Sequence, residues 1–242
     1  MTYTMETREI LPGFKAVGLT LHAVGEDALV LADLHLGFEE SLNRQGIMVP
    51  RFQYKDVVSE VDEALRIARP GKVIICGDLK HEFGSISGQE WAEVMGFLRG
   101  LERYEVTIVK GNHDTVVGPI GDKKGVKMVD GLRIGSTLFI HGHEVPGKDS
   151  LAGVKTIVMA HEHPCVGLRE GDRVEKVKCF LVGRWGRYDL IVLPSMNLVT
   201  EGVDVMTEEL LSPLLTKGVG EFKAYGVEEG KVLSFGKAKN LH

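Results

Sequence analysis

Potential metal ligands follow five short apolar segments of this chain, each within a few residues of the point where the segment ends. In chain order these polar groups are Asp33-Leu34-His35, Gly77-Asp78, Asn112-His113-Asp114, His141-Gly142-His143 and His161-Glu162-His163. Imidazole nitrogens, carboxylate oxygens and amide oxygens are all ligands for divalent metal ions in proteins. The pattern therefore indicates a metal site assembled from segments that are far apart in the sequence.

The number of these groups exceeds what one ion needs. Four histidines, two aspartates and one asparagine are more ligands than one tetrahedral ion takes. The count is typical of two ions that share a carboxylate bridge. Two ions about 3.5–4 Å apart can hold a hydroxide between them and stabilise an in-line displacement at phosphorus.

The apolar segments in front of these groups are typical of strands that are buried on both faces. Each is four or five residues long and lacks a clean alternation of apolar and polar residues. They are Ala28–Ala32, Lys72–Cys76, Val106–Val109, Thr137–Ile140 and Thr156–Ala160, and Leu190–Leu193 is similar. In an open α/β sheet, ligands bind outside the carboxyl ends of the strands. We therefore expect the polar groups to converge on one rim of a sheet.

Two segments with helical periodicity lie between the first three of these predicted strands. Phe52–Ala68 and Gly88–Tyr104 carry apolar residues at a spacing near 3.6, so the first half is predicted as alternating parallel strands and helices. Glycines interrupt the second half, which favours an antiparallel or mixed sheet. A helix near Thr207–Leu215 and short strands near Phe222–Val227 and Lys231–Phe235 are expected to close the chain. Because there is no repeat and no long linker, we expect one domain over residues 1–242.

Composition narrows the class of protein. The 242 residues are 43% hydrophobic and 26% charged, as in ordinary globular proteins, and the net charge of −5 disfavours a broad nonspecific nucleic-acid binder. None of the three cysteines lies in a CxxC motif, so neither a disulfide framework nor a zinc ribbon is indicated. The start of the chain lacks a signal-peptide pattern and no apolar run of about 18 residues exists. We expect a cytoplasmic protein without membrane contact, and leave a homo-oligomer open.

The order D-x-H, G-D, G-N-H-D, H and H-x-H resembles the calcineurin-like metallophosphoesterase superfamily. The strings LADLHLG, CGDLKHEFG and AHEHP resemble its ICC-like branch, which includes DNA-ligase-associated phosphoesterases. The resemblance implies a metal-dependent phosphoric ester hydrolase with an α/β fold, a four-layer αββα sandwich of two mixed β-sheets flanked by helices. Ala160 stands where many members have glycine, and we expect little effect unless that position needs a positive φ.

The resemblance also implies a role for each polar group. The first ion would be held by Asp33, His35, Asp78 and His163, and the second by Asp78, Asn112, His141 and His161, with Asp78 bridging the two. His113 would stabilise the transferring phosphoryl group or protonate the leaving oxygen, and Asp114 could orient His113. Manganese is the first choice for both divalent ions, with iron, zinc or nickel as alternatives.

Several further residues have two interpretations. His81 and Lys80 could contact the substrate phosphate, as in the similar GDLFH string of double-strand-break repair nucleases, or belong to an ordinary solvated loop. His143 is interpreted as a group behind the ligands or a loop residue rather than as a ligand. The segment Gly183–Arg187 could contact phosphate or a base, but a solvated turn is favoured. Cys165 is not needed as a ligand, because the predicted ligands already fill the site.

The predicted function is hydrolysis of a phosphodiester by attack of a metal-bridging hydroxide. The acidic net charge favours a small nucleotide-type substrate over long duplex DNA. The alternatives are a DNA-repair nuclease and a non-catalytic scaffold of the same fold. A scaffold would be expected to have lost ligands or the histidine of the G-N-H-D motif, whereas all of these residues are present.

Overall fold

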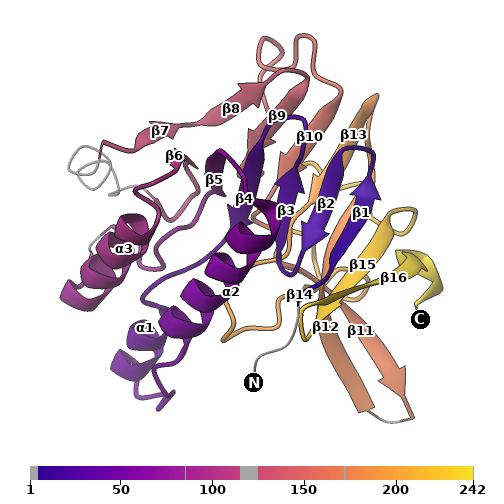
Figure 1. Cartoon of the computed structure of the whole chain (residues 1–242). Helices are drawn as coiled ribbons and strands as arrows, with labels where there is room; N and C mark the ends of the chain where they lie inside the picture. Colours follow the sequence, from indigo (N-terminus) through magenta and orange to yellow (C-terminus); the bar gives the residue numbers. More distant parts are fainter. Residues whose placement is uncertain (1–4, 85, 115–124, 172, 242) are drawn as a thin grey trace.

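The protein, described by a computed structural model over residues 5–84, 86–114, 125–171 and 173–241, contains two β-sheets that pack face to face (Figure 1). The first sheet has the strand order β1-β2-β3-β4-β5-β6-β7. Its strands are β1 (Thr7–Leu11), β2 (Phe14–Val17), β3 (Thr20–Ala23), β4 (Ala28–Ala32), β5 (Lys72–Cys76), β6 (Glu105–Val109) and β7 (Lys127–Val129). Strands β1 to β4 pair antiparallel and β4 to β7 pair parallel, so the sheet is mixed.

Helices cover the outer face of this first sheet. They are α2 (Gln53–Ala68) and α3 (Gly88–Gly100), and the short helix α1 (Phe38–Arg44) precedes α2 in the chain. Apolar side chains of α2 and α3, such as Val61 and Phe97, pack in one buried cluster with side chains of β4 and β5. The helical spacing of these residues in the sequence produces this buried stripe. Helix α3 begins at a capping box in which Ser87 and Glu90 satisfy each other's backbone N–H groups.

The second sheet is also mixed and has the order β14-β11-β12-β13-β10-β9-β8, with β15 pairing β12 and β16. Its strands are β8 (Gly131–Ile134), β9 (Thr137–Ile140), β10 (Thr156–Met159), β11 (Pro164–Glu170), β12 (Arg173–Trp185), β13 (Tyr188–Val192), β14 (Val203–Asp204), β15 (Lys223–Glu228) and β16 (Lys231–Lys237), followed by the 3-10 turn η1 (Ala238–Asn240). Strands β9, β10 and β13 run parallel at its centre. The hairpin of β11 and β12 extends away from the sandwich (Figure 1).

A buried core joins the two sheets. Val30 and Ile74 of the first sheet pack with Phe139, Val158 and other side chains of the second. The single residue Asp130 separates β7 from β8, so the chain passes directly from one sheet into the other. The parallel strands β4, β5, β6, β9 and β10 therefore belong to one framework, and the segments that follow them come together at one rim.

The outer face of the second sheet differs from that of the first. Among the described residues it is covered by irregular segments, which contribute Leu151, Leu214 and Phe222 to a third core cluster. The predicted helix near Thr207–Leu215 is wrong. The backbone N–H groups of Leu211 and Ser212 donate to the Glu162 carboxylate, so they are not used in a helix. The α/β sandwich of two mixed sheets is confirmed.

Most predicted elements along the motif-bearing part of the chain are confirmed within one or two residues, although α3 ends at Gly100 rather than Tyr104. Strands β1 to β3 and the long hairpin of β11 and β12 were not predicted. No helix in the described part of the chain is long and apolar enough to cross a lipid bilayer.

Candidate metal centre and active site

All seven predicted ligands lie at one rim of the sandwich. They follow the carboxyl ends of five parallel strands, with Asp33 and His35 after β4, Asp78 after β5, Asn112 after β6, His141 after β9, and His161 and His163 after β10. Six of the seven side chains form two clusters, in each of which the potential ligand atoms lie within 4.8 Å of one another. The predicted convergence on one rim is thus seen, and both sheets contribute to it.

The first cluster consists of Asp33, His35 and His163. His35 Nε2 lies 3.2 Å from His163 Nε2, and His163 Nε2 lies 3.4 Å from Asp33 Oδ2. Asp33 and His35 are buried, whereas the His163 side chain is 21% exposed. This cluster therefore opens to solvent on the side of His163.

The second cluster consists of Asp78, Asn112, His141 and His161. His141 Nε2 lies 2.9 Å from Asn112 Oδ1, 3.1 Å from His161 Nδ1 and 3.4 Å from Asp78 Oδ2. The other ring nitrogen, His141 Nδ1, lies 3.3 Å from the carbonyl oxygen of Cys76. A backbone carbonyl on the second nitrogen is the usual arrangement for a metal-binding histidine, because it fixes the ring orientation.

Asp78 lies between the two clusters. Its Oδ2 atom is 3.4 Å from His141 Nε2 in the second cluster and 3.8 Å from His35 Nε2 in the first. Its Oδ1 atom accepts a hydrogen bond from the His113 backbone N–H at 2.9 Å. One carboxylate oxygen is thus held by the backbone and the other faces both clusters, which is the geometry that a bridging ligand requires.

The donor atoms fit two divalent ions. Two atoms bound to the same ion at about 2.1 Å lie about 3.0–3.4 Å apart, depending on the coordination angle. The nitrogen and oxygen atoms of the second cluster fall close to this range, and so do those of the first. Asp33 Oδ1 is buried and has no hydrogen-bond partner among the described residues. It lies 3.6 Å from His141 Nδ1, whereas Asp33 Oδ2 faces His163 Nε2 and is the oxygen that would bind an ion in the first cluster.

The backbone at the centre is in an unusual conformation. Five of the seven predicted ligands, namely Asp33, His35, Asp78, His161 and His163, have φ between 45° and 72°. Side chains other than glycine rarely adopt this left-handed region, and such residues concentrate at functional sites. Ala160 has no positive φ, so this position does not demand the glycine found in many family members.

Two glycines allow the loops to approach one another. A Cβ atom on Gly77 would lie 2.1 Å from His141 Nδ1, and one on Gly111 would lie 2.1 Å from Asp78 Oδ1. Neither distance is sterically possible, and Gly77 also has a φ of 79°. The glycine before Asp78 and the glycine before Asn112 are therefore needed for the geometry of the second cluster.

The histidines of the two clusters differ in their pKa values. Burial lowers the pKa of His141, but the hydrogen bond to Asp78 and the charges of Asp33 and Asp78 outweigh it and raise the pKa to about 9. Burial lowers the pKa of His35 to about 3, and the neighbouring His163 contributes in the same direction. His161 behaves like His35, because burial and the charge of His141 lower its pKa to about 4. His35 and His161 are therefore neutral near pH 7, the form in which imidazole binds metal.

His113 lies beside the clusters, as predicted for a group that acts next to the ions. Its ring centroid is 4.9 Å from that of His35, and His113 Nε2 lies 4.0 Å from Asp78 Oδ2. His113 Nδ1 contacts the backbone carbonyl of His81. This contact leaves Nε2 as the nitrogen that faces the centre.

Asp114 holds backbone rather than the His113 ring. Its carboxylate accepts hydrogen bonds from the N–H groups of Gly111 at 2.9 Å and Leu79 at 3.2 Å. These bonds tie the loop after β6 to the loop after β5. Burial raises the pKa of Asp114 to about 6. The predicted orientation of His113 by Asp114 can therefore act only through the loop backbone that both residues share.

His81 and Lys80 occupy different environments. The half-buried His81 ring packs edge-on against Phe38 at 4.4 Å and stacks with His113 at 5.6 Å. Lys80 is fully buried, and its Nζ donates to the carbonyl oxygen of Glu82. Burial makes the solvated-loop interpretation of Lys80 wrong, and contact of Lys80 or His81 with a substrate phosphate stays a prediction.

The sequence analysis missed Phe83, Glu162 and Ser212. Phe83 packs on the His113 ring with 3.7 Å between ring centroids. Glu162 is buried between the two ligands of the H-x-H motif, and its carboxylate accepts the N–H groups of Leu211 and Ser212. Ser212 Oγ donates to the carbonyl oxygen of Gly142 at 2.7 Å, so one segment fastens the loops that carry His141 and His161. The H-x-H spacing alone could have drawn attention to Glu162.

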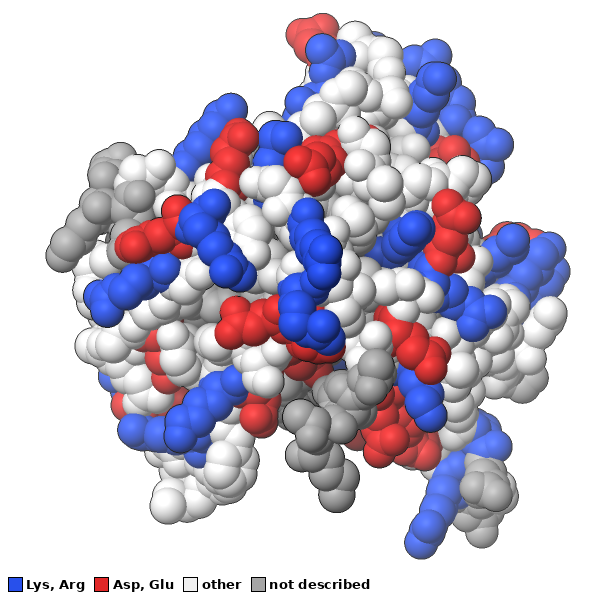
Figure 2. Space-filling view, in the orientation of Figure 1, with Lys and Arg blue, Asp and Glu red and all other residues white. Residues whose placement is uncertain are grey.

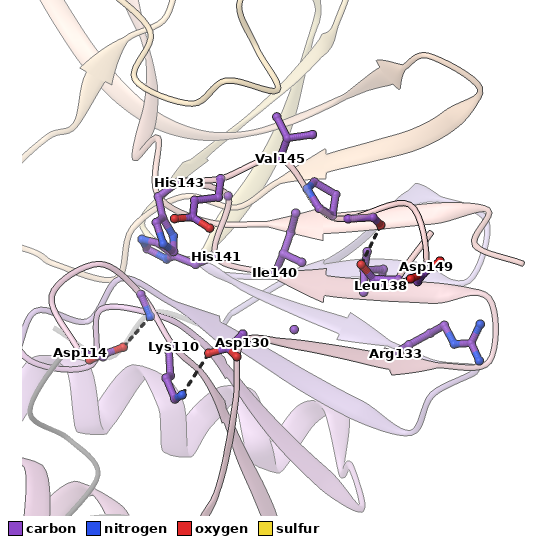
Figure 3. A pocket seen from close by; sticks show the side chains of 17 residues that line it. Lys110, Asp114, Asp130, Arg133, Leu138, Ile140, His141, His143, Val145 and Asp149 are labelled. Carbon is purple, nitrogen blue, oxygen red and sulfur yellow. Dashed lines mark hydrogen bonds and ion pairs between the residues drawn. The ribbon is translucent and has the colours of Figure 1, made fainter. Parts of the chain in front are cut away.

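A groove of about 710 Å³ leads away from the second cluster. Figure 3 shows His141 and His143 at one end of it, Ile140 and Leu138 on its floor, and Lys110 paired with Asp130 along one side. Arg133 and Asp149 lie at the far end (Figure 3). His143 therefore lines the groove beside the predicted ligands.

Two other predicted features lie outside the centre. Arg187 lies in the turn between β12 and β13, and Arg184 lies near the end of β12. Arg184 Nη2 donates to the Arg187 carbonyl, and the rings of Trp185 and Tyr188 stack. Because β13 runs parallel to β10, this turn lies at the opposite end of the sheet from the ligands. Cys165 is a buried free cysteine, as expected for a core residue.

Comparison with known proteins agrees with this geometry. The family model for calcineurin-like phosphoesterases matches residues 28–180, a range that includes all seven predicted ligands and His113. The structure is similar to that of nuclease MPE from Pseudomonas putida, with 17% sequence identity, a TM-score of 0.68, and coverage of 96% of this chain and 100% of the other. It is more distantly similar to Yfce, a phosphoesterase from E. coli, with 14% identity, a TM-score of 0.42, and coverage of 83% and 87%. No curated protein matches the chain in sequence.

Proposed function

The chain belongs to the calcineurin-like phosphoesterase family and is a metal-dependent phosphoester hydrolase, and on this premise we propose that it cleaves phosphodiesters of nucleotide type with two ions acting together. The position of Asp78 Oδ2, within 3.8 Å of a nitrogen in each cluster, is the observation that carries the two-ion proposal. A single shared oxygen of this kind is useful only if both clusters are occupied.

The two clusters would hold one ion each, with Asp78 shared between them. When bound, the ions lower the pKa of a water molecule and neutralise the charge that develops on the phosphoryl oxygens. The ligands keep fixed positions, because Asp33 is held by the N–H of His161 and Asp78 by the N–H of His113. The chain thus presents a preorganised site and needs little rearrangement during the reaction.

His113 is proposed to assist the leaving oxygen. Its Nδ1 contacts the carbonyl oxygen of His81, and a carbonyl can only accept, so Nδ1 carries a proton. In the imidazolium form of His113, Nε2, which faces the centre, also carries a proton and can donate it to the oxygen that leaves phosphorus, while Nδ1 keeps its own. We assign His113 as this proton donor.

The surroundings of the centre favour a small substrate. The net charge is −5, and Figure 2 shows lysine and arginine side chains interspersed with acidic ones over the face of the molecule that it draws. The groove beside the second cluster carries Lys110 and Arg133 together with Asp130 and Asp149. A long polyanion would meet these carboxylates along its path, whereas a nucleotide-sized diester need not.

Cleavage of a DNA strand is the second candidate. It is favoured by the structural similarity to a nuclease over 96% of this chain. A DNA strand would occupy the same two clusters, so the two candidates differ in the length of the substrate and not in its chemistry.

A panel of substrates tests the proposal. After loading with manganese, the protein is assayed on phosphomonoesters, linear and cyclic nucleotide diesters, and single-stranded and duplex DNA, with Asp78→Asn as the inactive control. We expect the highest kcat/KM on a nucleotide diester and two bound ions per chain by metal analysis. Cleavage of monoesters alone would contradict the diesterase proposal, and cleavage of DNA strands in clear preference to short diesters would favour the nuclease. A metal-loaded protein that hydrolyses none of them would support a non-catalytic scaffold.

A further inference from the structure

Four aromatic rings from three separate segments of the chain form a row along one side of the first cluster. In order they are Phe38 at the start of α1, His81 after β5, His113 after β6, and Phe83, again from the loop after β5. The centroid distances between successive rings are 4.4 Å, 5.6 Å and 3.7 Å. We call these four residues the aromatic row.

Phe83 is the exposed end of this row. Its side chain is 60% exposed, whereas His113 and His81 are at least partly buried. The planes of the Phe83 and His113 rings are inclined by only 33°, so Phe83 covers a face of the histidine. An exposed phenylalanine is ordinary by itself. Phe83 is of interest because it contacts His113, the histidine proposed to donate a proton to the leaving group.

The loop that carries Phe83 is held by a buried carboxylate. Glu90 is fully buried, and its Oε1 atom accepts the N–H groups of His81 and Glu82, both at 2.9 Å. Its Oε2 atom lies 3.3 Å from the N–H of Ser87. The two residues directly before Phe83 are therefore fixed to the first turn of α3.

We propose that Phe83 is the substrate-stacking residue of this enzyme, and that the group on the leaving-oxygen side of the scissile phosphate is a planar nucleobase. With His113 as the proton donor, the leaving oxygen would lie near His113 Nε2, and the exposed Phe83 ring packs on the same histidine. Stacking on an aromatic side chain suits any nucleobase, because every base has a π-face. The inference rests on the proposed diesterase function and adds the chemical class of the leaving group.

The test compares substrates that differ only in one base. They are the dinucleotide dTpdT and its two abasic analogues, each lacking the base on one side of the phosphate, assayed on the manganese-loaded protein. We expect kcat/KM to fall about tenfold when the base on the leaving side is absent, and to change little when the other base is absent. Phe83→Ala should cleave dTpdT and the analogue without the leaving-side base with nearly the same kcat/KM. Phe83→Trp should restore the preference for the base.

The matched control is Phe52→Ala. Phe52 is also an exposed phenylalanine, 63% accessible, at the start of α2, and no ring contact between it and a site histidine is seen in the described residues. This variant should keep the wild-type preference for the base. A second readout is independent of turnover. The fluorescence of a dinucleotide that contains 2-aminopurine should be quenched when it binds to the metal-free wild-type protein. Binding to metal-free Phe83→Ala should quench this fluorescence less.

The outcomes distinguish a failure of the stacking role of Phe83 from a failure of the diesterase function. If the wild type cleaves all three dinucleotides equally, or if Phe83→Ala lowers all three rates by the same factor, the stacking role is wrong while the diesterase function stands. If the loaded wild type cleaves none of them, the diesterase function is wrong and the stacking role falls with it. A longer single strand identifies the source of the base, since a DNA-directed enzyme would show the same Phe83 dependence with a higher kcat/KM on the strand.

Discussion

The two ligand clusters share one carboxylate but have different neighbours. The first cluster, which contains His35, lies beside the aromatic row, with the ring centroids of His81 and His113 at 5.5 Å and 4.9 Å from that of His35. The second cluster, which contains His141, lies at the end of a groove that carries side chains of both charges. The phosphate of a diester carries two organic groups. The different surroundings of the two clusters would allow the proposed diesterase to distinguish these groups. The predictions below alter one cluster, both clusters or their surroundings.

Replacing the carboxylate that the two clusters share should impair both of them at once. Asp78→Asn takes a negative charge away from both, so we expect loss of both ions and a fall in kcat on the order of a thousandfold or more. Metal analysis and initial rates measure this, and circular dichroism checks that the fold survives. Near-wild-type activity of the folded variant with metals supplied would remove the basis for a two-ion mechanism.

Variants of a single cluster should affect one ion only. Asn112→Ala and His161→Ala should each lower the metal content from two ions to one by weakening the second cluster, and His35→Ala should do the same for the first. We expect kcat to fall by about a hundredfold to a thousandfold in each case, because one ion cannot stabilise both the attacking and the leaving oxygen. Loss of both ions from Asn112→Ala would show that the clusters do not fill independently.

His113→Ala should separate proton donation from metal binding. The metal content should stay at two ions, and kcat should fall by about a hundredfold or more. A diester with a good leaving group, such as a nitrophenyl ester, needs less proton donation and should lose less activity. An equal loss on good and poor leaving groups would exclude the proton-donor role.

Glu162→Gln should weaken metal binding without removing a ligand. The amide can no longer accept all the N–H groups that the carboxylate accepts, so the segment with Leu211 and Ser212 is released from the H-x-H motif. We expect the affinity for the ions to fall about tenfold, in the range of other groups that orient ligands. The exposed Glu209→Gln in the same segment is the control, and equal affinities of the two variants would contradict the role of Glu162.

The smallest expected effect is a pH dependence of the metal-free protein. The pKa of His141 is about 9 in the folded chain, against 6.5 as its ordinary value. A raised pKa stabilises the fold fully below pH 6.5, and this contribution is lost as the pH rises through about 9. In the presence of a chelator, the melting temperature should therefore fall by a few degrees more for wild type than for His141→Gln between pH 6.5 and 9.5. Parallel curves for the two proteins would show that His141 is not protonated in the folded state.

The centre was predictable because each ligand directly follows a short run of buried, branched residues. The runs before Asp33 and His161 need no distant information to be recognised as strands, and their parallel order places their ends together. The support around the ligands was not predictable in this way. Glu162 meets Ser212 across 50 residues, and Ser195 Oγ donates to the Asp33 carbonyl across 162. Such contacts depend on tertiary packing, which no local pattern contains.

The errors also have physical causes. The segment Thr207–Leu215 has the apolar spacing of a helix, but its N–H groups find a stronger partner in a buried carboxylate. Strands β1 to β3 are short, polar on one side and joined by tight turns, so their sequence has no continuous apolar run. Phe83 was missed because a single aromatic residue in a loop has no pattern at all.

The left-handed backbone at five of the ligands has a consequence for the evolution and engineering of this protein. A side chain held in that conformation costs about 1 kcal/mol or more relative to glycine, so the chain gives up stability at the positions where it needs carboxylates and imidazoles. Replacing Asp33 or His163 by glycine should yield a metal-free protein that melts higher than the alanine variant. The active centre is thus a trade-off between folding and chemistry, and selection for thermal stability alone would tend to erase it.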